Sequence, residues 1–193
     1  MRWVGDSAVL LEAGSVARAH RLRAACAGLP GVLETVVGDG SVLVYVGAGV
    51  DLAALAALTP VDAAALEPRT VVVPVRYDGP DLAEVAELTG LAEDEVVRRH
   101  SGALYTVAFT GFAPGFGYLT GLDPALRVPR RDAPRTRVPA GSVAIAGEYA
   151  GVYPRATPGG WRLLGRTDVV LFDPDRDPPG LFGPGDRVRF EAL

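Results

Sequence analysis

Residues 104–122 read "LYTVAFTGFAPGFGYLTGL", a short apolar strand pattern followed at once by glycines, a proline and three aromatic rings. Glycine and proline interrupt regular structure, whereas the rings of Phe112, Phe116 and Tyr118 must be buried against something. The segment therefore suits neither a helix interior nor an ordinary exposed loop. It predicts a strand and sharp turns that place the rings either along a ligand pocket or in the core of a small barrel.

Short strand patterns bounded by glycine or proline continue through the rest of the chain. Such spacing is typical of a closed or nearly closed β-barrel. The predicted strands are 104–110, 142–147, 149–154, 161–167, 169–173 and 187–192.

The segment before this region predicts one strand and two helices. The strand is 70–77, and the helices are 81–90 and 92–100. Asp81 followed three residues later by Glu84 predicts a capping box at the start of the first helix. The second helix has acids in its first turn and arginines in its last, as the helix dipole favours.

The N-terminal part has a different pattern, which predicts a small α+β unit. Its helices begin at Ser15 and Asp51, and the turn 38–41 predicts a hairpin. Because the composition changes after this part, we expect domains 1–66 and 67–193. The N-terminal elements are a strand at 7–13, a helix at 15–29, hairpin strands at 32–38 and 41–47, and a helix at 51–58.

Composition excludes several kinds of site. The chain has no lysine, asparagine or glutamine, so a P-loop and a Schiff-base lysine are excluded. With two histidines and one cysteine, Cys26, we expect no metal site, and we expect Cys26 to be buried filler. The net charge of −4 argues against nucleic acid, although arginines outnumber acids between 100 and 172 and could attract a small anion. The absence of a signal peptide or membrane-span pattern predicts a cytoplasmic protein with no membrane partner.

Several motifs together resemble the KipI/PxpB family, once called allophanate hydrolase subunit 1. The resemblance spans nearly the whole chain and implies an α+β fold, with a small N-terminal α/β sandwich followed by a C-terminal cyclophilin-like β-barrel. The motifs are His100, "YTVAFTGFAPGFGYLTGL" (105–122), Pro129-Arg130, Pro134-Arg135, "VPAGSVAIAG" (138–147), "GVYP" (151–154), "TPGGWRLLGRT" (157–167) and "GPGDRVRF" (183–190).

The resemblance also implies an activity and partners. It implies a subunit of ATP-dependent 5-oxoprolinase, inactive alone, working with a subunit-2 (PxpC-type) protein and a LamB/YcsF-type (PxpA) component on a lactam or amide substrate. ATP is expected to serve the complex, and no nucleotide site can be assigned to this chain. The alternative is a KipI-like regulator that binds and inhibits a sensor histidine kinase. Prolyl isomerase activity, suggested by the barrel alone, is disfavoured because the glutamine of that groove cannot exist here.

The motifs give candidate site residues. His100, Arg135 and Tyr153 are candidate catalytic residues, although a helix-end His100 satisfied by local hydrogen bonds is an equal alternative. Where the family usually has Gly-Gln-Thr, this chain has Glu148, Tyr149 and Ala150, which leaves the substrate open. The candidate substrate-binding residues are Phe112, Pro114, Phe116, Tyr118, Arg130, Pro139, Ala140, Gly141, Ser142, Thr157, Pro158, Gly159, Gly160 and Trp161.

Overall fold

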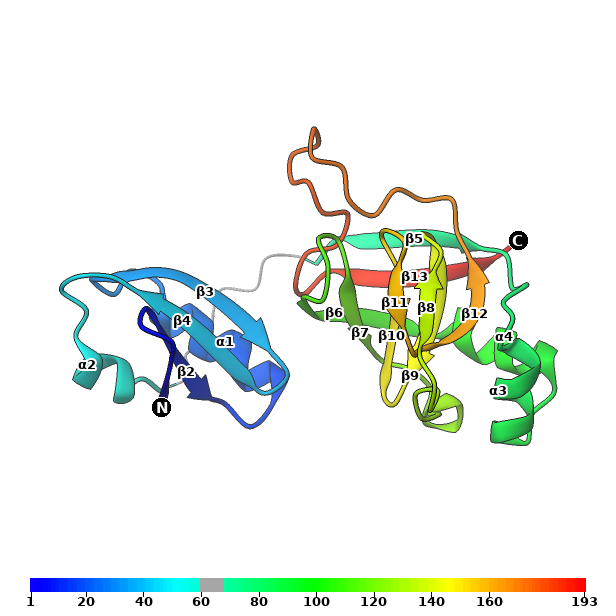
Figure 1. Ribbon diagram of the computed structural model, residues 1–193, viewed down its shortest axis with the longest axis horizontal. Coiled ribbons are helices and arrows are strands. Elements are labelled where there is room, and N and C mark those ends of the chain that lie inside the picture. Colours follow the sequence, from blue (N-terminus) through cyan, green and yellow to red (C-terminus); the bar gives the residue numbers. More distant parts are fainter. Residues whose placement is uncertain (60–67) are drawn as a thin grey trace. The chain divides into compact units, whose positions relative to one another are not determined.

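The computed structural model describes residues 1–59 and 68–193 and divides the chain into two compact units. The units are Met1–Glu67 and Pro68–Leu193, and each has its own sheet (Figure 1). The expected boundary between residues 66 and 67 lies outside the described residues.

The N-terminal unit is a four-stranded antiparallel sheet with the order β1-β2-β4-β3. Helix α1 packs against β3 and β4, and the Ser15 hydroxyl caps it by accepting from the Arg18 N–H. Cys26 is fully buried at the end of α1, as expected. The hairpin is confirmed, whereas β1 was not predicted. The elements are β1 (Arg2–Val4), β2 (Ala8–Glu12), α1 (Val16–Cys26), β3 (Val32–Gly38), β4 (Ser41–Val46) and α2 (Leu52–Ala56).

The second unit is a nearly closed barrel, which confirms the predicted fold class. Its main sheet has the order β12-β9-β10-β7-β6-β13-β5. Arg76, just after β5, and Arg166 of β12 exchange two main-chain hydrogen bonds of 2.9 Å, which join the two ends of the sheet. The elements are β5 (Thr70–Val75), α3 (Leu82–Thr89), α4 (Glu93–Gly102), β6 (Leu104–Thr110), β7 (Gly117–Thr120), η1 (Pro124–Leu126), β8 (Arg135–Val138), β9 (Ser142–Ala146), β10 (Tyr149–Val152), β11 (Thr157–Gly159), β12 (Arg162–Arg166) and β13 (Arg187–Ala192).

Two expectations about this unit are wrong. Residues 169–173 do not form a strand, because they make only an isolated bridge between Phe172 and Gly180. The capping box is also absent, since the Asp81 side chain makes no capping hydrogen bond to α3. Asp81 binds distant groups instead, and these belong to the site described below.

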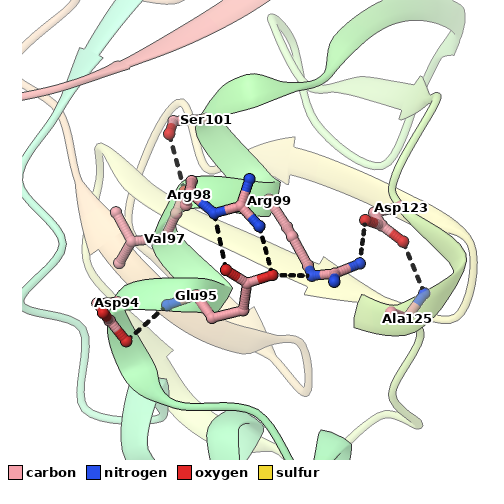
Figure 2. Close-up of polar contacts among 8 residues, drawn as sticks. All are labelled: Asp94, Glu95, Val97, Arg98, Arg99, Ser101, Asp123 and Ala125. Carbon is pink, nitrogen blue, oxygen red and sulfur yellow. Dashed lines mark hydrogen bonds and ion pairs between the residues drawn. The ribbon is translucent and has the colours of Figure 1, made fainter.

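Helices α3 and α4 pack together at one end of the barrel (Figure 1). Glu95 of α4 accepts from both Arg98 and Arg99, and Arg99 donates to Asp123 at 3.0 Å (Figure 2). Asp123 in turn accepts from the Ala125 N–H at the start of η1. The contacts from Glu95 through Arg99 to Asp123 thus connect η1 to α4. None of the helices in the described part of the chain has the length and apolar character needed to cross a membrane.

Strand β9 shows how the barrel positions the site, because both of its faces are buried. Val143 and Ile145 point into the main core, as the alternation of a strand requires. Ala144 and Ala146 point to the opposite face and join a second apolar cluster. The residues of this second cluster are Ala113, Phe116, Val138, Ala144, Ala146, Tyr153, Trp161 and Leu163.

Candidate functional site

Three residues of the second apolar cluster, Phe116, Tyr153 and Trp161, line a small cavity of about 100 Å³, which we call the aromatic pocket. The sequence predicted all of its lining residues as candidates, and the structure brings them together. They are Phe112, Phe116, Tyr118, Arg130, Tyr153, Gly159, Gly160 and Trp161.

Small side chains on the sheet make room for the rings. A Cβ atom on Gly151 would lie 2.9 Å from the Phe116 ring and 3.1 Å from the Trp161 ring, so both rings rest directly on the β10 backbone. Ala144 and Ala146 of the neighbouring strand β9 also have small side chains, and they belong to the same cluster as these rings. The outward face of the barrel is therefore shaped for aromatic packing.

Phe116 lies at the centre of these rings and is almost fully buried. Its ring centroid is 5.1 to 5.6 Å from those of four others, all in edge-to-face arrangements. Such arrangements stabilise aromatic clusters beyond the area that they bury. The four partner rings are Phe112, Tyr118, Tyr153 and Trp161.

Phe112 forms the exposed rim of the pocket. Its φ of 66° is left-handed, a conformation that side chains with a Cβ rarely adopt. The turn imposes this, since the Ala113 N–H donates to the Gly111 carbonyl at 2.7 Å and Gly111 donates to Phe116. Although 57% exposed, the Phe112 ring contacts Phe116 and Tyr153. Strain of this kind is typical of functional sites.

Tyr153 closes the base of the pocket. It is buried, and burial raises the pKa of the phenol, an effect that the Trp161 main-chain N–H partly opposes. A Cβ atom on Gly159 would lie 2.4 Å from the Tyr153 hydroxyl oxygen. Glycine at 159 is thus required for Tyr153 to lie where it does. Because the phenol stays protonated at neutral pH, it can donate a hydrogen bond but cannot serve as an anionic base.

Arg130 provides the charge of the pocket. Among the lining residues that the structure describes, Arg130 alone is charged, and no hydrogen bond or ion pair of its guanidinium is found in the described ranges. Its positive charge opposes the rise in pKa that burial causes at Tyr118 and Tyr153. The Arg130 guanidinium thus lowers the pKa of both phenols relative to burial alone.

Asp81, which was not among the candidates, organises the segments beside the pocket. Its side chain is 2% exposed and accepts from both terminal nitrogens of Arg135, at 2.9 and 2.7 Å. It also accepts from Arg131 at 3.0 Å and from the Leu163 N–H at 2.7 Å. Burial alone would raise the pKa of this carboxyl, but the hydrogen bonds from Arg135 and Leu163 lower it overall.

Glu84, one turn along α3, extends this network. It forms ion pairs with Arg131, at 3.2 Å, and with Arg162 of β12. The two acids of the expected capping box thus bind three arginines from distant segments. A local motif gave no sign of this, because the partners lie 47 or more residues away.

The remaining candidates near Arg135 line a different cavity, of about 330 Å³, which we call the arginine groove. Arg135 is bound to Asp81, and Arg166 is bound to Asp78 at 2.8 Å, so acids already neutralise both guanidinium groups. Arg135 therefore lies apart from the aromatic pocket with its charge engaged. The groove is lined by Asp78, Gly79, Pro80, Arg135, Arg137, Pro139, Ala140, Ser142, Leu163, Gly165 and Arg166.

His100 lies in neither cavity. It is fully buried on α4, its ring stacked 4.6 Å from that of Phe190, and its Nδ1 is 2.7 Å from the Tyr77 hydroxyl. Burial lowers its pKa to about 3. The structure thus places His100 as a neutral core residue away from the other candidates, with Nδ1 hydrogen-bonded to a residue 23 positions away and Nε2 without a partner among the described residues.

The other candidates flank the two cavities. Pro114 and Pro158 are exposed, and Gly141 lines neither cavity, although its N–H donates at 2.7 Å to the carbonyl of Tyr153, which lines the aromatic pocket. Thr157 lies on β11 with a buried hydroxyl that finds no hydrogen-bond partner among the described residues. No group of three or more potential metal ligands was found in the described ranges.

The structure also locates two of the residues that stand where the family usually has Gly-Gln-Thr, namely Tyr149 and Ala150. Tyr149 packs edge-on against Tyr118, which lines the pocket, with ring centroids 5.6 Å apart. Ala150 is buried in the barrel core. Tyr149 therefore contacts a residue that lines the aromatic pocket without lining the pocket itself, whereas Ala150 belongs to the barrel core.

Comparison with known proteins agrees with the motifs. The family model for the carboxyltransferase domain, subdomain C and D, matches residues 1–182. The B component of 5-oxoprolinase from Escherichia coli O157:H7 is 45% identical over 97% of this chain and 93% of its own length. The B component of 5-oxoprolinase from Bacillus subtilis is 48% identical over 65% of this chain and 53% of its own length.

Solved structures have the same fold. The protein TTHA0988 has a TM-score of 0.83 and 41% identity over 96% of this chain, which spans only 40% of the TTHA0988 chain. PH0987 from Pyrococcus horikoshii gives 0.63 and 34% identity over the whole chain and 96% of its own. The urea amidolyase of K. lactis, at 21% identity, shows a shared fold alone, with a TM-score of 0.77 over 14% of its chain. The match over nearly the full length of the E. coli protein confirms the resemblance, and the chain belongs to the PxpB/KipI family, that of the 5-oxoprolinase B component.

Proposed function

We propose that this chain is a cytoplasmic, non-autonomous subunit of an ATP-dependent 5-oxoprolinase that converts 5-oxoproline to glutamate. In this proposal it acts with a subunit-2 (PxpC-type) protein and a LamB/YcsF-type (PxpA) component. The observation that carries the proposal is the 45% identity with the B component of E. coli 5-oxoprolinase over nearly the whole of both chains.

The aromatic pocket supports a binding role for this subunit. Hydrolysis of the lactam breaks its C–N bond, with water supplying the hydroxyl to the carbonyl carbon and a proton to the nitrogen. ATP bound by the assembled complex would supply a phosphoryl group that activates the lactam oxygen, with ADP as the first product, and that group would leave as phosphate when water has added and the C–N bond breaks. The residues of this chain would hold the lactam in a defined orientation and exclude bulk water, which are large contributions to catalysis.

The described residues give little support for ATP binding by this chain alone. Helix N-termini often bind phosphate, but α4 of the barrel unit begins with Glu93, Asp94 and Glu95, whose charges disfavour a triphosphate there. The chain also has no lysine for a P-loop. We therefore assign nucleotide binding to the partner or to a site that the partner completes.

The proposal is tested by reconstitution. The purified chain, the two partner components and all three together are assayed for ATP-dependent release of glutamate from 5-oxoproline. We expect no turnover by the chain alone and turnover by the full set. Substantial turnover by the chain alone would refute the shared site, while a stable complex without turnover would favour the regulatory alternative.

A further inference from the structure

We propose that the aromatic pocket selects a small ring that bears a carboxylate and an uncharged nitrogen, with Arg130 binding the carboxylate. This inference rests on the proposed function and deepens it, since 5-oxoproline has this combination of groups. Its nitrogen is a neutral lactam N–H, whereas the product glutamate carries an ammonium group.

The position of Arg130 is fixed by its neighbours while its own side chain stays available. The Arg131 N–H donates to the Gly160 carbonyl at 2.8 Å, and the Arg131 guanidinium binds Asp81 and Glu84. On the other side, Arg162 donates to the Pro129 carbonyl at 3.3 Å. The backbone on both sides of Arg130 is thus anchored, and its side chain is placed at the pocket without being bound to an acid.

Asp81 and Glu84, the acids that bind the neighbouring Arg131, are also paired with other arginines. Asp81 binds Arg131 and Arg135, and Glu84 binds Arg131 and Arg162. A guanidinium that has no acidic partner among the described residues and lies next to an apolar cavity is suited to a carboxylate, which it can bind through two parallel hydrogen bonds.

The rest of the pocket explains the preference for a neutral nitrogen. Within the described ranges, no acid lines the pocket, so a ligand ammonium group would find no counter-ion among the lining residues and would lie beside a positive guanidinium. A lactam N–H avoids this repulsion and needs only a neutral acceptor. At about 100 Å³, the cavity suits a single small ring packed against Phe116 and Trp161.

Arg130 is exposed, whereas Phe116 and Trp161 are buried. This arrangement matches a ligand whose carboxylate faces the mouth and whose ring lies deeper. Opening of the lactam would create an ammonium group in a pocket without an acid, so the site would favour release of the product.

Fluorescence can test this directly, because the chain has two tryptophans, Trp3 and Trp161. In a Trp3→Phe background, the emission of Trp161 reports on the pocket. The full-length chain is titrated with 5-oxoproline, with 2-pyrrolidinone, which lacks the carboxylate, and with proline, which has an ammonium-type nitrogen. We expect 5-oxoproline to change the Trp161 emission at the lowest concentration of the three.

Arg130→Ala is the decisive variant, and Arg189→Ala is its control because Arg189 is an exposed arginine of β13 that lines neither cavity. Arg130→Ala should weaken binding of 5-oxoproline by about tenfold to a hundredfold, as expected for loss of a hydrogen-bonded charge pair. It should leave binding of 2-pyrrolidinone unchanged. In the reconstituted complex the same variant should raise KM for 5-oxoproline much more than it lowers kcat.

Two results would overturn the inference: equal binding of proline and 5-oxoproline, or Kd and KM values that Arg130→Ala leaves within about twofold of the parent. If the complex hydrolyses 5-oxoproline normally in the Arg130→Ala variant, the inference fails while the proposed function stands. If the parent complex has no such activity but the titrations behave as expected, the proposed function fails while the pocket's selectivity stands.

Discussion

The carboxylate of Asp81 and the guanidinium of Arg135 form a two-point ion pair, with N–O distances of 2.9 and 2.7 Å, although the residues lie 54 positions apart. The carboxylate is buried and also binds the Leu163 N–H. Asp81 thus connects the start of α3 to β8 and β12, two strands that line the arginine groove.

Removing the charge of Asp81 should strongly destabilise the barrel unit. Asp81→Asn leaves the partly buried guanidinium group of Arg135 without its counter-ion and removes one of the two acids that bind Arg131, which should cost about 2–4 kcal/mol of unfolding free energy. Urea unfolding followed by Trp161 emission in the Trp3→Phe background measures this. Asp78→Asn is the matched control, because the Asp78–Arg166 pair is exposed and such pairs contribute about 0–1 kcal/mol. Equal effects of the two variants would contradict the central role of Asp81.

His100 should remain uncharged at physiological pH. Its pKa is lowered from 6.5 to about 3 by burial, so the unfolded chain binds this proton more readily than the folded one. The stability that neutral His100 contributes is therefore complete above pH 6.5 and is lost as the pH falls toward 3. In a His20→Ala variant, the imidazole NMR signals of His100 should not titrate between about pH 8 and pH 5. A titration midpoint near 6.5 would show that the ring is solvated.

Two adjacent glycines should respond differently to alanine. At Gly159 the new Cβ would lie 2.4 Å from the hydroxyl oxygen of buried Tyr153, so Gly159→Ala should displace that ring and cost about 1–3 kcal/mol in unfolding free energy. At Gly160 the nearest atom is 3.6 Å away, an ordinary contact, so Gly160→Ala should be close to neutral. Urea unfolding of both variants, with the same Trp161 readout, checks the difference. Similar stabilities would mean that Tyr153 can move freely.

The left-handed backbone at Phe112 should make glycine the better replacement. Phe112→Gly and Phe112→Ala both remove the ring, but only alanine keeps the Cβ that disfavours a φ of 66°. Phe112→Gly should therefore be about 1–2 kcal/mol more stable than Phe112→Ala in chemical denaturation. If the two variants unfold at the same denaturant concentration, the turn is not strained.

The aromatic pocket could be predicted from the sequence because its determinants are local. Glycines, prolines and rings are concentrated in residues 111–122 and 157–161, and each segment alone indicates turns that carry aromatic side chains. The structure shows that these segments form one cavity. The alternation of β9 explains why the rings line a cavity without filling the barrel core, since Val143 and Ile145 point into that core while Ala144 and Ala146 face the aromatic cluster.

The Asp81 network could not be predicted in the same way. Asp81 and Glu84 have the spacing of a capping box, and local spacing contains no information about partners 47 to 82 residues away. The separation of Arg135 from Arg130 into different cavities has the same origin, because Asp81 binds one of them and leaves the other available. The sequence alone does not decide between a catalytic and a structural role for His100, because its burial against Phe190 depends on a contact between distant segments.

Strand β13 lies between β5 and β6 and pairs with β5 in parallel along its whole length, from Arg187 opposite Thr70 to Ala192 opposite Val75. The first strand of the barrel therefore has no neighbour along its length until residues 187–192 have left the ribosome. During synthesis, β5 is therefore an unpaired apolar segment that chaperones or strands of other nascent chains can bind. A ribosome stalled before residue 187 should thus carry an N-terminal unit able to fold and a barrel that cannot yet close.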